Sequence, residues 1–261
     1  GSGVLTGENN IAIGKTALSA ATAAYYNVGI GYWALKANTD GEKNIAIGAG
    51  SLAANTTGDY NIAIGYEALD GSDTESSLIA IGRGALGGTN QGGAYNIGLG
   101  NYALGGATSA TYNIAMGQSA GQQITTGGSN VLLGASAGYV LTDGSSNIAI
   151  GRNALDNTDS ESHNIAIGRD SLGGAIDGGE YNIAIGNYSL DALTTGDYNT
   201  AIGYEAGTDT TTAGYSTFVG YRAGYYATTQ YQNTAFGANA LFGASGTVTG
   251  GKNTAVGYNA L

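Results

Sequence analysis

The sequence predicts an all-β protein, a parallel β-solenoid of about 15 coils with a repeat of about 17 residues. The tetrad Ile-Ala-Ile-Gly, or a close variant, recurs along the whole chain. Its apolar residues alternate with period two, and a turn-forming segment follows each glycine. A chain that repeats one short unit many times is a stack of similar coils rather than a globule with a unique pocket.

The repeat is marked by its glycine. The spacing is 17 residues in most coils, 18 between Gly82 and Gly100 and between Gly168 and Gly186, and 20 between Gly237 and Gly257. We expect this glycine to serve a turn that needs a positive φ or a close approach of two backbones.

Within each unit the pattern predicts one short strand. In the unit Tyr60–Leu69, helix is disfavoured because glycine recurs too often, and β-branched Ile62 and Ile64 alternate with small Ala63. A strand of four or five residues is not stable alone, but copies stacked at ~4.8 Å form a parallel sheet. Fifteen coils at that spacing predict a rod on the order of 70 Å long.

The alternation assigns the side chains to two sides of the strand. The residue before each glycine is always large and apolar, and with the Ile or Val two places earlier it is expected to line the inside. In the last four coils the earlier position is threonine, which is interpreted as a change in core chemistry. These threonines are Thr200, Thr217, Thr234 and Thr254.

The position between them is expected to face outward, yet it is Ala or Gly in all coils except those with Leu132 and Phe218. An outward position in water would drift to polar residues, so small residues there predict that another subunit packs against this face. A second alanine three residues after most glycines, followed by leucines such as Leu18, supports the same interpretation. The predicted subunit-packing residues are Ala12, Ala46, Ala63, Ala80, Ala115, Ala149, Ala166, Ala184 and Ala201.

An asparagine precedes the strand in every coil except those with Leu78 and Ser216. Stacked asparagines can form a ladder in which each side chain bonds its equivalent one coil away, which is a structural role. The predicted ladder consists of Asn10, Asn27, Asn44, Asn61, Asn96, Asn113, Asn130, Asn147, Asn164, Asn182, Asn199, Asn233 and Asn253.

Tyrosine is the main aromatic residue, with 19 copies against 3 phenylalanines. Rows of tyrosine suit stacking between coils, and they also suit contact with sugar faces or proteins. The possible recognition row follows the repeat glycine directly and consists of Tyr32, Tyr66, Tyr204, Tyr221 and Tyr258.

Composition argues against several function classes. There is no cysteine, and the single histidine, His163, stands where other coils have tyrosine before the asparagine, so neither a catalytic residue nor a metal site is predicted. The oxygen-rich segments Asp70–Glu75 and Asp156–Glu161 do not match an EF-hand or a calcium-binding β-roll, and no cofactor is expected. Eight basic residues among 19 acids disfavour nucleic-acid binding, and no apolar run is long enough to insert in a membrane.

The segments Asn61–Ala68 (Asn-Ile-Ala-Ile-Gly-Tyr-Glu-Ala) and Asn253–Ala260 (Asn-Thr-Ala-Val-Gly-Tyr-Asn-Ala) resemble the YadA-like head repeats of trimeric autotransporter adhesins and related repeats of bacteriophage tail fibres. The resemblance covers essentially the whole chain. It implies a left-handed parallel β-roll, three rolls packed around a common axis, and attachment at a cell or virion surface. The repeat is longer than that of the bacterial heads, and residues 1–261 contain no segment expected to form a stalk or an anchor.

Together these observations predict one repeat domain over residues 1–261, open at both ends and cut from a longer protein or fibre. The expected function is that of a non-enzymatic, extracellular or virion-surface fibre module, a rigid spacer with adhesive capacity. Its expected partners are its own copies, as a homotrimer or stacked end to end, and a glycan or protein receptor. The alternatives are a subunit of a self-assembling filament and an ice-binding solenoid, which would want an outward threonine ladder.

Overall fold

The computed structural model describes residues 7–88, 93–243 and 250–260. Within these ranges the protein is all-β, without any helix, and consists of parallel strands that each belong to one coil of a solenoid. The chain divides into two compact units, residues 1–129 and 130–261. That the two act as a single domain stays a prediction. The first unit holds β1 (Ile11–Ile13), β2 (Val28–Ile30), β3 (Ile45–Ile47), β4 (Ile62–Ile64), β5 (Ile79–Ile81), β6 (Ile97–Leu99) and β7 (Ile114–Met116). The second unit holds β8 (Val131–Leu133), β9 (Ile148–Ile150), β10 (Ile165–Ile167), β11 (Ile183–Ile185), β12 (Thr200–Ile202), β13 (Thr217–Val219), β14 (Thr234–Phe236) and β15 (Thr254–Val256).

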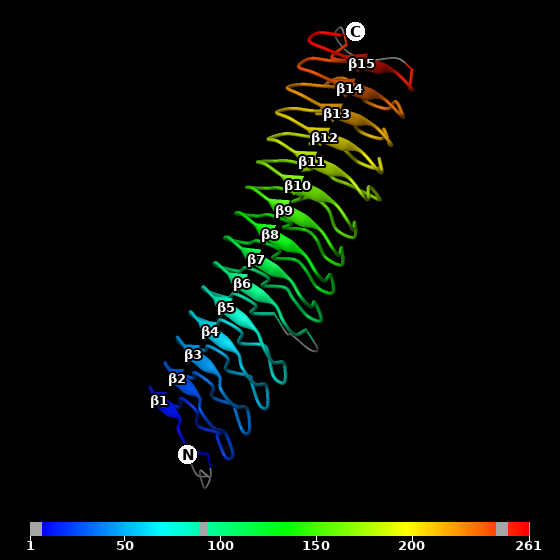
Figure 1. The fold of residues 1–261 in the computed structure, drawn as a ribbon. Helices are drawn as coiled ribbons and strands as arrows, with labels where there is room; N and C mark the ends of the chain where they lie inside the picture. Colours follow the sequence, from blue (N-terminus) through cyan, green and yellow to red (C-terminus); the bar gives the residue numbers. More distant parts are fainter. Residues whose placement is uncertain (1–6, 89–92, 244–249, 261) are drawn as a thin grey trace. The chain divides into compact units, whose positions relative to one another are not determined.

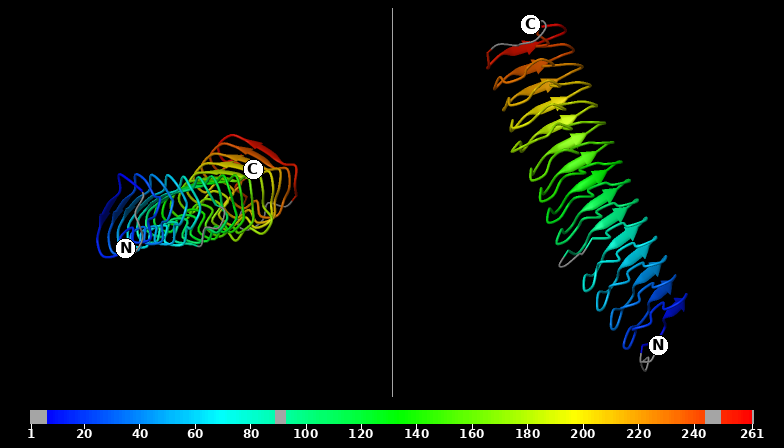
Figure 2. Two further views of the ribbon diagram at one scale, coloured as in Figure 1. Left: turned by 90° about the horizontal axis from the view of Figure 1, so that it is seen from below. Right: turned by 180° about the vertical axis from the view of Figure 1, so that it is seen from behind.

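Within each unit, every strand pairs in parallel with the next strand along the chain, and the connecting segment returns behind the sheet (Figures 1 and 2). The register places equivalent residues beside each other, for example Ile62 beside Ile79 and Ala63 beside Ala80. The 18-residue spacing does not shift this register, because Ile79 still pairs with Ile97 across β5 and β6. Residues at the same position of successive repeats therefore form a row along each unit.

The strands contain three residues rather than the four or five predicted. They are short because residues with positive φ bend the chain on both sides: in the fourth coil Tyr60 before the strand has φ 59°, and Glu67 and Leu69 after it have φ 52° and 53°. This conformation is unfavourable for side chains other than glycine. The backbone N–H groups of Tyr60 and Leu69 donate to Glu42 and Ala85 of the neighbouring coils at 3.1 and 3.0 Å, so bonds between coils hold the bends.

The repeat glycine fulfils both parts of its prediction. Gly65 has φ 141°, and a Cβ there would lie 2.5 Å from the carbonyl oxygen of Gly82 in the next coil. No other residue fits this turn without displacing the backbone of its neighbour.

The predicted inside and outside of the strand are exchanged, and this is the main correction to the sequence analysis. The middle residue of the strand is buried inside its own coil, and the large apolar residues on either side of it face outward. The proposed subunit-packing residues Ala46, Ala63, Ala80, Ala115, Ala149, Ala166, Ala184 and Ala201 are fully buried, and Ala12 is exposed in the first strand. The buried alanines are therefore inaccessible to a second subunit.

The leucine after the strand explains why the middle residue is small. A Cβ at Gly29, the middle residue of β2, would lie 3.4 Å from Cδ1 of Leu18, the leucine that follows β1 in the preceding coil, and 3.5 Å from the carbonyl oxygen of Ala34 in its own coil. Leu18 is nearly buried, and its equivalents Leu35 and Leu52 are fully buried. The interior thus has room for an alanine facing a leucine, so the chain's own packing selects the small residue.

The two exceptions follow the same rule. Where Leu132 occupies the middle position, the leucine after the strand is replaced by Gly138, and a Cβ there would lie 2.8 Å from Leu132 Cδ2. Where Phe218 occupies it, glycine stands at the leucine position of the same coil, Gly224, and of the preceding coil, Gly207, where a Cβ would lie 2.8 Å from Phe218 Cδ2. Large and small residues have exchanged places across the same interior.

Two further expectations change with this orientation. The four threonines at the first strand position lie on the outer face of the sheet: Thr217, Thr234 and Thr254 are exposed and Thr200 is half-buried, so they do not alter the core. If Ala149 faced outward, as its place among the predicted subunit-packing residues requires, a bulky charged residue there would disturb assembly alone. Since Ala149 lies in the core of its coil, such a residue would disrupt the coil itself.

Candidate interaction surfaces

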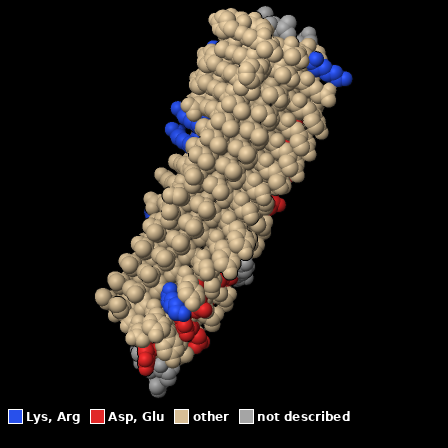
Figure 3. All heavy atoms as spheres, in the orientation of Figure 1, with Lys and Arg blue, Asp and Glu red and all other residues tan. Residues whose placement is uncertain are grey.

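The isoleucine face, defined as the first and third residues of the strands, is an apolar surface that continues from strand to strand in each unit. It consists mainly of isoleucine with Val, Leu, Met, Thr and Phe, and no strand contains a charged residue. Even in β3 and β5, which are flanked by other strands on both sides, the side chains of Ile47 and Ile81 are 37% and 41% exposed. Figure 3 shows how few charged side chains lie on the face it displays. Scattered apolar side chains are normal on a protein surface, but continuous rows of them mark an interaction surface.

The asparagine ladder is present, and it bonds mainly to the backbone. The backbone N–H of Asn44 donates to Asn27 Oδ1 at 2.9 Å, and Asn44 Nδ2 donates to the carbonyl oxygen of Gly58 at 2.7 Å. Side-chain amides also bond each other directly in several coils, as Asn199 Nδ2 donates to Asn182 Oδ1 at 3.1 Å. The ladder asparagines are buried or half-buried, and their side chains hydrogen-bond to neighbouring coils.

The two coils without a ladder asparagine show which of its hydrogen bonds another residue can replace. Ser216 Oγ accepts a hydrogen bond from the backbone N–H of Asn233 at 3.2 Å, so the ladder continues to the next coil through this one bond. The backbone N–H of Leu78 donates to Asn61 Oδ1 at 3.0 Å, but the Leu78 side chain has no acceptor to offer the next coil.

A second row, the tyrosine ladder, lies directly before the asparagines and contains the longest aromatic stacks. In the second unit His163 stacks on Tyr181 at 4.8 Å between ring centroids, Tyr181 on Tyr198 at 5.0 Å, and Tyr198 on Tyr215 at 5.1 Å. In the first unit Tyr95 stacks on Tyr112 at 5.1 Å. His163 is thus a member of an aromatic row, as predicted.

The predicted recognition row after the glycines is exposed but less continuous. Among its members only Tyr204 and Tyr221 stack on each other, with centroids 5.7 Å apart and planes 9° from parallel. Tyr32 stacks on Trp33 instead, while Tyr66 and Tyr258 are exposed. Hydrogen bonding to the neighbouring glutamates, Glu67 and Glu205, raises the pKa of Tyr66 and of Tyr204.

Beside Tyr204 and Tyr221 lies a mixed aromatic and charged cluster. Arg222 Nε donates to Glu205 Oε2 at 2.6 Å, and the guanidinium lies 5.2 Å from the ring centroid of Tyr221 and 5.5 Å from that of Tyr225. Tyr225 also meets Tyr226 edge-on with centroids 4.6 Å apart. This part of the recognition row offers both ring surfaces and charged hydrogen-bonding groups.

The two oxygen-rich segments use their glutamates inside the coil. Glu161 is 2% exposed: its Oε2 accepts the backbone N–H groups of Asp159 and Ser160 at 3.1 Å, and its Oε1 accepts that of Gly178 at 2.7 Å. Glu75 Oε2 likewise accepts Ser72 Oγ at 3.0 Å. These carboxylates satisfy turn donors, and in the described ranges no group of three or more His, Asp or Glu side chains could hold a metal ion.

Four aspartates after the strands, Asp70, Asp156, Asp191 and Asp209, have a raised pKa because they are partly buried. Burial raises the pKa of Asp156 and of Asp191 to about 6, and it also raises the pKa of Asp70. Asp191 Oδ1 is buried without a hydrogen-bond partner, so its ionised form is poorly solvated. These groups lie on separate coils and do not form a paired acid and base.

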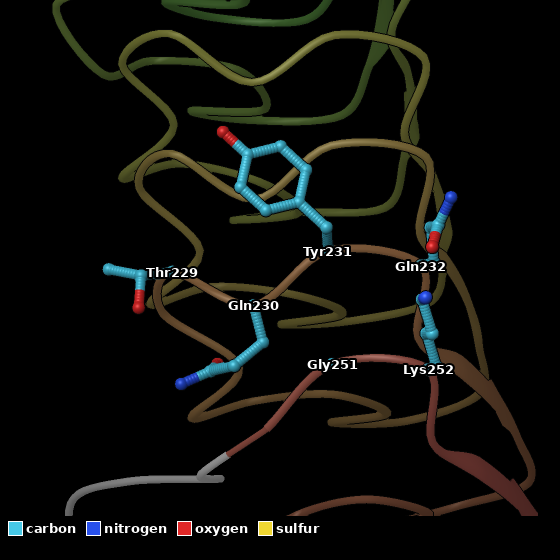
Figure 4. A pocket seen from close by; sticks show the side chains of 6 residues that line it. All are labelled: Thr229, Gln230, Tyr231, Gln232, Gly251 and Lys252. Atoms are coloured by element: carbon cyan, nitrogen blue, oxygen red, sulfur yellow. The ribbon is translucent and has the colours of Figure 1, made fainter.

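Figure 4 shows a shallow pocket lined by Thr229, Gln230, Tyr231, Gln232, Gly251 and Lys252. The side chains point in different directions: Tyr231 extends toward the preceding coils, Gln230 to one side, and Gln232 and Lys252 along the other. Because these groups do not converge, the pocket has no arrangement that would orient a substrate.

Sequence reasoning missed the isoleucine face because it placed these residues inside. The signal was present in the sequence: Leu132 and Phe218 are followed by Gly138 and Gly224 where most other coils have leucine. This exchange of large and small residues places the middle strand residue opposite the leucine, and hence inside.

The part of the chain that the structure describes contains no helix of the length and apolarity needed to cross a bilayer. No protein-family model, no curated protein and no solved structure matches this chain.

Proposed function

We propose that this chain is a structural module of a fibre, whose copies associate through the isoleucine face and whose exposed tyrosines make attachment contacts. The observation that carries the proposal is the isoleucine face itself. An outward row in water would drift to Thr, Lys or Glu, but in most coils these positions hold Ile, Val or Leu. Burial of such a row against a second copy removes apolar surface from water and requires no charge pairing.

Three copies around a common axis are the proposed assembly, as the resemblance to YadA-like heads implies. A symmetric association uses the same surface on every copy, and an identical repeat on each chain supplies matching rows. The buried alanines have no part in this contact, so the proposal replaces the alanine face of the sequence analysis with the isoleucine face.

The association test is the mass in solution by light scattering after gel filtration, with negative-stain images of the same peak. The variant I64K/I185K introduces one cation on the isoleucine face of each unit, at positions that are half-buried in a single chain. Its matched control, T57K/T195K, adds the same charge at exposed turn positions.

We expect a discrete particle of three chains for the wild type and for the control, and single chains with an unchanged β spectrum for I64K/I185K. A monomeric wild type, or an assembly that tolerates both lysines, would contradict the proposal. Rods of indefinite mass would favour the filament alternative, in which copies stack end to end.

The attachment function is assigned to the recognition row, and its strongest segment is Tyr204, Tyr221 and Arg222. Aromatic faces beside hydrogen-bonding groups suit glycans and protein surfaces. A glycan array and a cell-binding assay test this part: Y204A/Y221A should lose retention, whereas Y139F should not. Equal retention of both variants would place attachment elsewhere.

One observation supports the ice-binding alternative. Thr217, Thr234 and Thr254 are exposed on the outer face of β13–β15, and so form the outward threonine row that an ice-binding solenoid needs. The row covers only the end of the second unit. A thermal-hysteresis assay on the wild type and on T217K/T234K discriminates: activity lost in the variant would favour ice binding over subunit association.

A further inference from the structure

The tyrosine ladder places phenol rings of successive coils face to face within each unit. Tyr181 and Tyr198 lie with ring centroids 5.0 Å apart and planes 1° from parallel, and Tyr198 and Tyr215 are 5.1 Å apart at 18°. Tyr95 and Tyr112 have the same arrangement in the first unit, 5.1 Å apart at 7°. Neighbouring rings therefore lie at about the spacing of parallel strands, in a row fixed by the backbone.

These rings are also accessible to reagents. Tyr181, Tyr198 and Tyr215 are 43%, 49% and 61% exposed, so solvent reaches the ring edges and hydroxyls while the faces cover each other. The backbone of each residue is held at φ between 56° and 58°, and this common conformation directs the three side chains alike.

We propose that the stacked tyrosine pairs are sites of oxidative dityrosine cross-linking, which joins adjacent coils covalently when a haem peroxidase and hydrogen peroxide act on the protein. Each phenol gives up one electron and its hydroxyl proton, and the resulting phenoxyl radical shares its spin with the ortho ring carbons. A carbon–carbon bond forms between one ortho carbon of each ring. The two ortho hydrogens then leave as protons and the oxygens are protonated again, which restores both phenols.

The balance of this step is two hydrogens lost from the pair of tyrosines and accepted by one peroxide, which becomes two waters. The proximity of the rings decides which pairs couple. Groups held side by side react at effective concentrations on the order of millimolar or more, so at about 1 μM protein coupling within a chain should exceed coupling between chains roughly 1000-fold. His163 stacks on Tyr181 but cannot couple to it in this way, because an imidazole does not form a phenoxyl radical. The series of pairs that can couple therefore ends at Tyr181.

The experiment treats the full chain at low concentration with haem peroxidase and peroxide, then locates cross-linked peptides by mass spectrometry and follows dityrosine fluorescence. We expect joined peptides, lighter by two hydrogens, for Tyr181 with Tyr198, Tyr198 with Tyr215, and Tyr95 with Tyr112. The cross-linked protein should also unfold at higher denaturant concentration, because the new bond closes a loop between coils.

The variant Y198F keeps the stacked ring but removes the central phenol. It should lower the yield of both cross-links at Tyr198 by at least about tenfold in view of that proximity advantage, and leave the pair Tyr95–Tyr112 unchanged. The matched control is Y139F, since Tyr139 takes part in none of the ring contacts of the described ranges, and it should leave every product in place. Denatured protein should lose the selectivity.

Cross-links that form mainly between chains, that join unstacked tyrosines as readily as stacked ones, or that persist in Y198F would overturn the proposal. So would the absence of dityrosine under conditions in which free tyrosine couples. None of these outcomes bears on association through the isoleucine face, which I64K/I185K tests separately.

Discussion

At the scale of single residues, Phe218 shows how the interior is filled. It is the largest fully buried side chain, and glycines occupy both leucine positions that would meet it, Gly207 and Gly224. Large and small residues are exchanged here while the filled volume is kept, which is the kind of core change that proteins tolerate best.

Replacing Phe218 with alanine should therefore leave a cavity and lower the free energy of unfolding by about 3–5 kcal/mol. The triple variant F218A/G207L/G224L restores the combination found in most coils and should recover much of that loss. Both leucines would adopt the positive φ that leucine has at this position elsewhere, as at Leu190 with φ 49°.

Denaturant unfolding checks this prediction. The control is G207L/G224L in the presence of Phe218, which should be destabilised because the new side chains overlap the ring. If the triple variant were no more stable than F218A, the exchange rule would be wrong.

Asp156 and Asp191 give the stability a pH dependence. Their folded pKa of about 6 lies above the ordinary 3.8, because burial disfavours the ionised form. Folding therefore favours the protonated form of both aspartates. Their contribution to the free energy of unfolding is fully present below a pH of about 4 and is lost as the pH rises through about 6.

We expect wild-type stability to fall between about pH 4 and about pH 6 more steeply than that of D156N/D191N, which cannot ionise at these positions. Denaturant midpoints measured across this range check the slope. D177N, at an exposed position, is the control for lost charge and should keep the wild-type slope. Parallel slopes for wild type and D156N/D191N would contradict the assignment.

At the scale of one coil, the asparagine ladder holds the strand to its neighbours at the point where the chain bends. Asn147 is representative. Its backbone N–H donates to Asn130 Oδ1 at 2.8 Å, its Nδ2 donates to the carbonyl oxygen of Glu161 at 2.8 Å, and its Oδ1 accepts the N–H of Asn164 at 2.9 Å.

N147A should leave the buried N–H of Asn164 and the buried carbonyl of Glu161 without their partners, and each loss should lower the free energy of unfolding by about 1–3 kcal/mol. N147S should cost roughly half as much, because Ser216 shows that a serine Oγ can still accept the N–H of the next coil. Denaturant unfolding ranks the variants, and hydrogen exchange at the Asn164 amide localises the effect. Similar losses for alanine and serine would mean that the bond to the next coil contributes little.

At the scale of the whole molecule, the charges lie in the turns and the strands carry none. The net charge of −11 therefore keeps the chains soluble without entering the proposed contact between them. The contact depends on apolar burial alone, as in the core of a subunit interface.

Association should accordingly change little as sodium chloride is raised from about 0.01 M to about 1 M, although the range of charge interactions shrinks from about 30 Å to about 3 Å. Urea should weaken it by solvating apolar surface. Light scattering across both series checks this, with T57K/T195K as the charge control. A particle that falls apart in salt would indicate ion pairs between turns instead of the isoleucine face.

Much of this could be predicted from the sequence because neighbouring coils repeat one environment. The period fixes the solenoid, the parallel register and the rows of equivalent residues, so the asparagine ladder and the place of His163 in an aromatic row followed directly. The strand length did not follow, since it depends on positive φ at residues such as Tyr60 and Leu69, which carry no local signal for that conformation.

By itself, then, the sequence determined that there are two rows of large side chains and one of small ones on opposite sides of each strand. Only the tertiary structure decided which side is inside. Alternation defines two faces but does not orient them. The orientation comes from the leucine after the strand, which in most coils packs inside and leaves room for only a small residue at the middle strand position. The large apolar rows are therefore left on the outside, where they form the surface proposed for association.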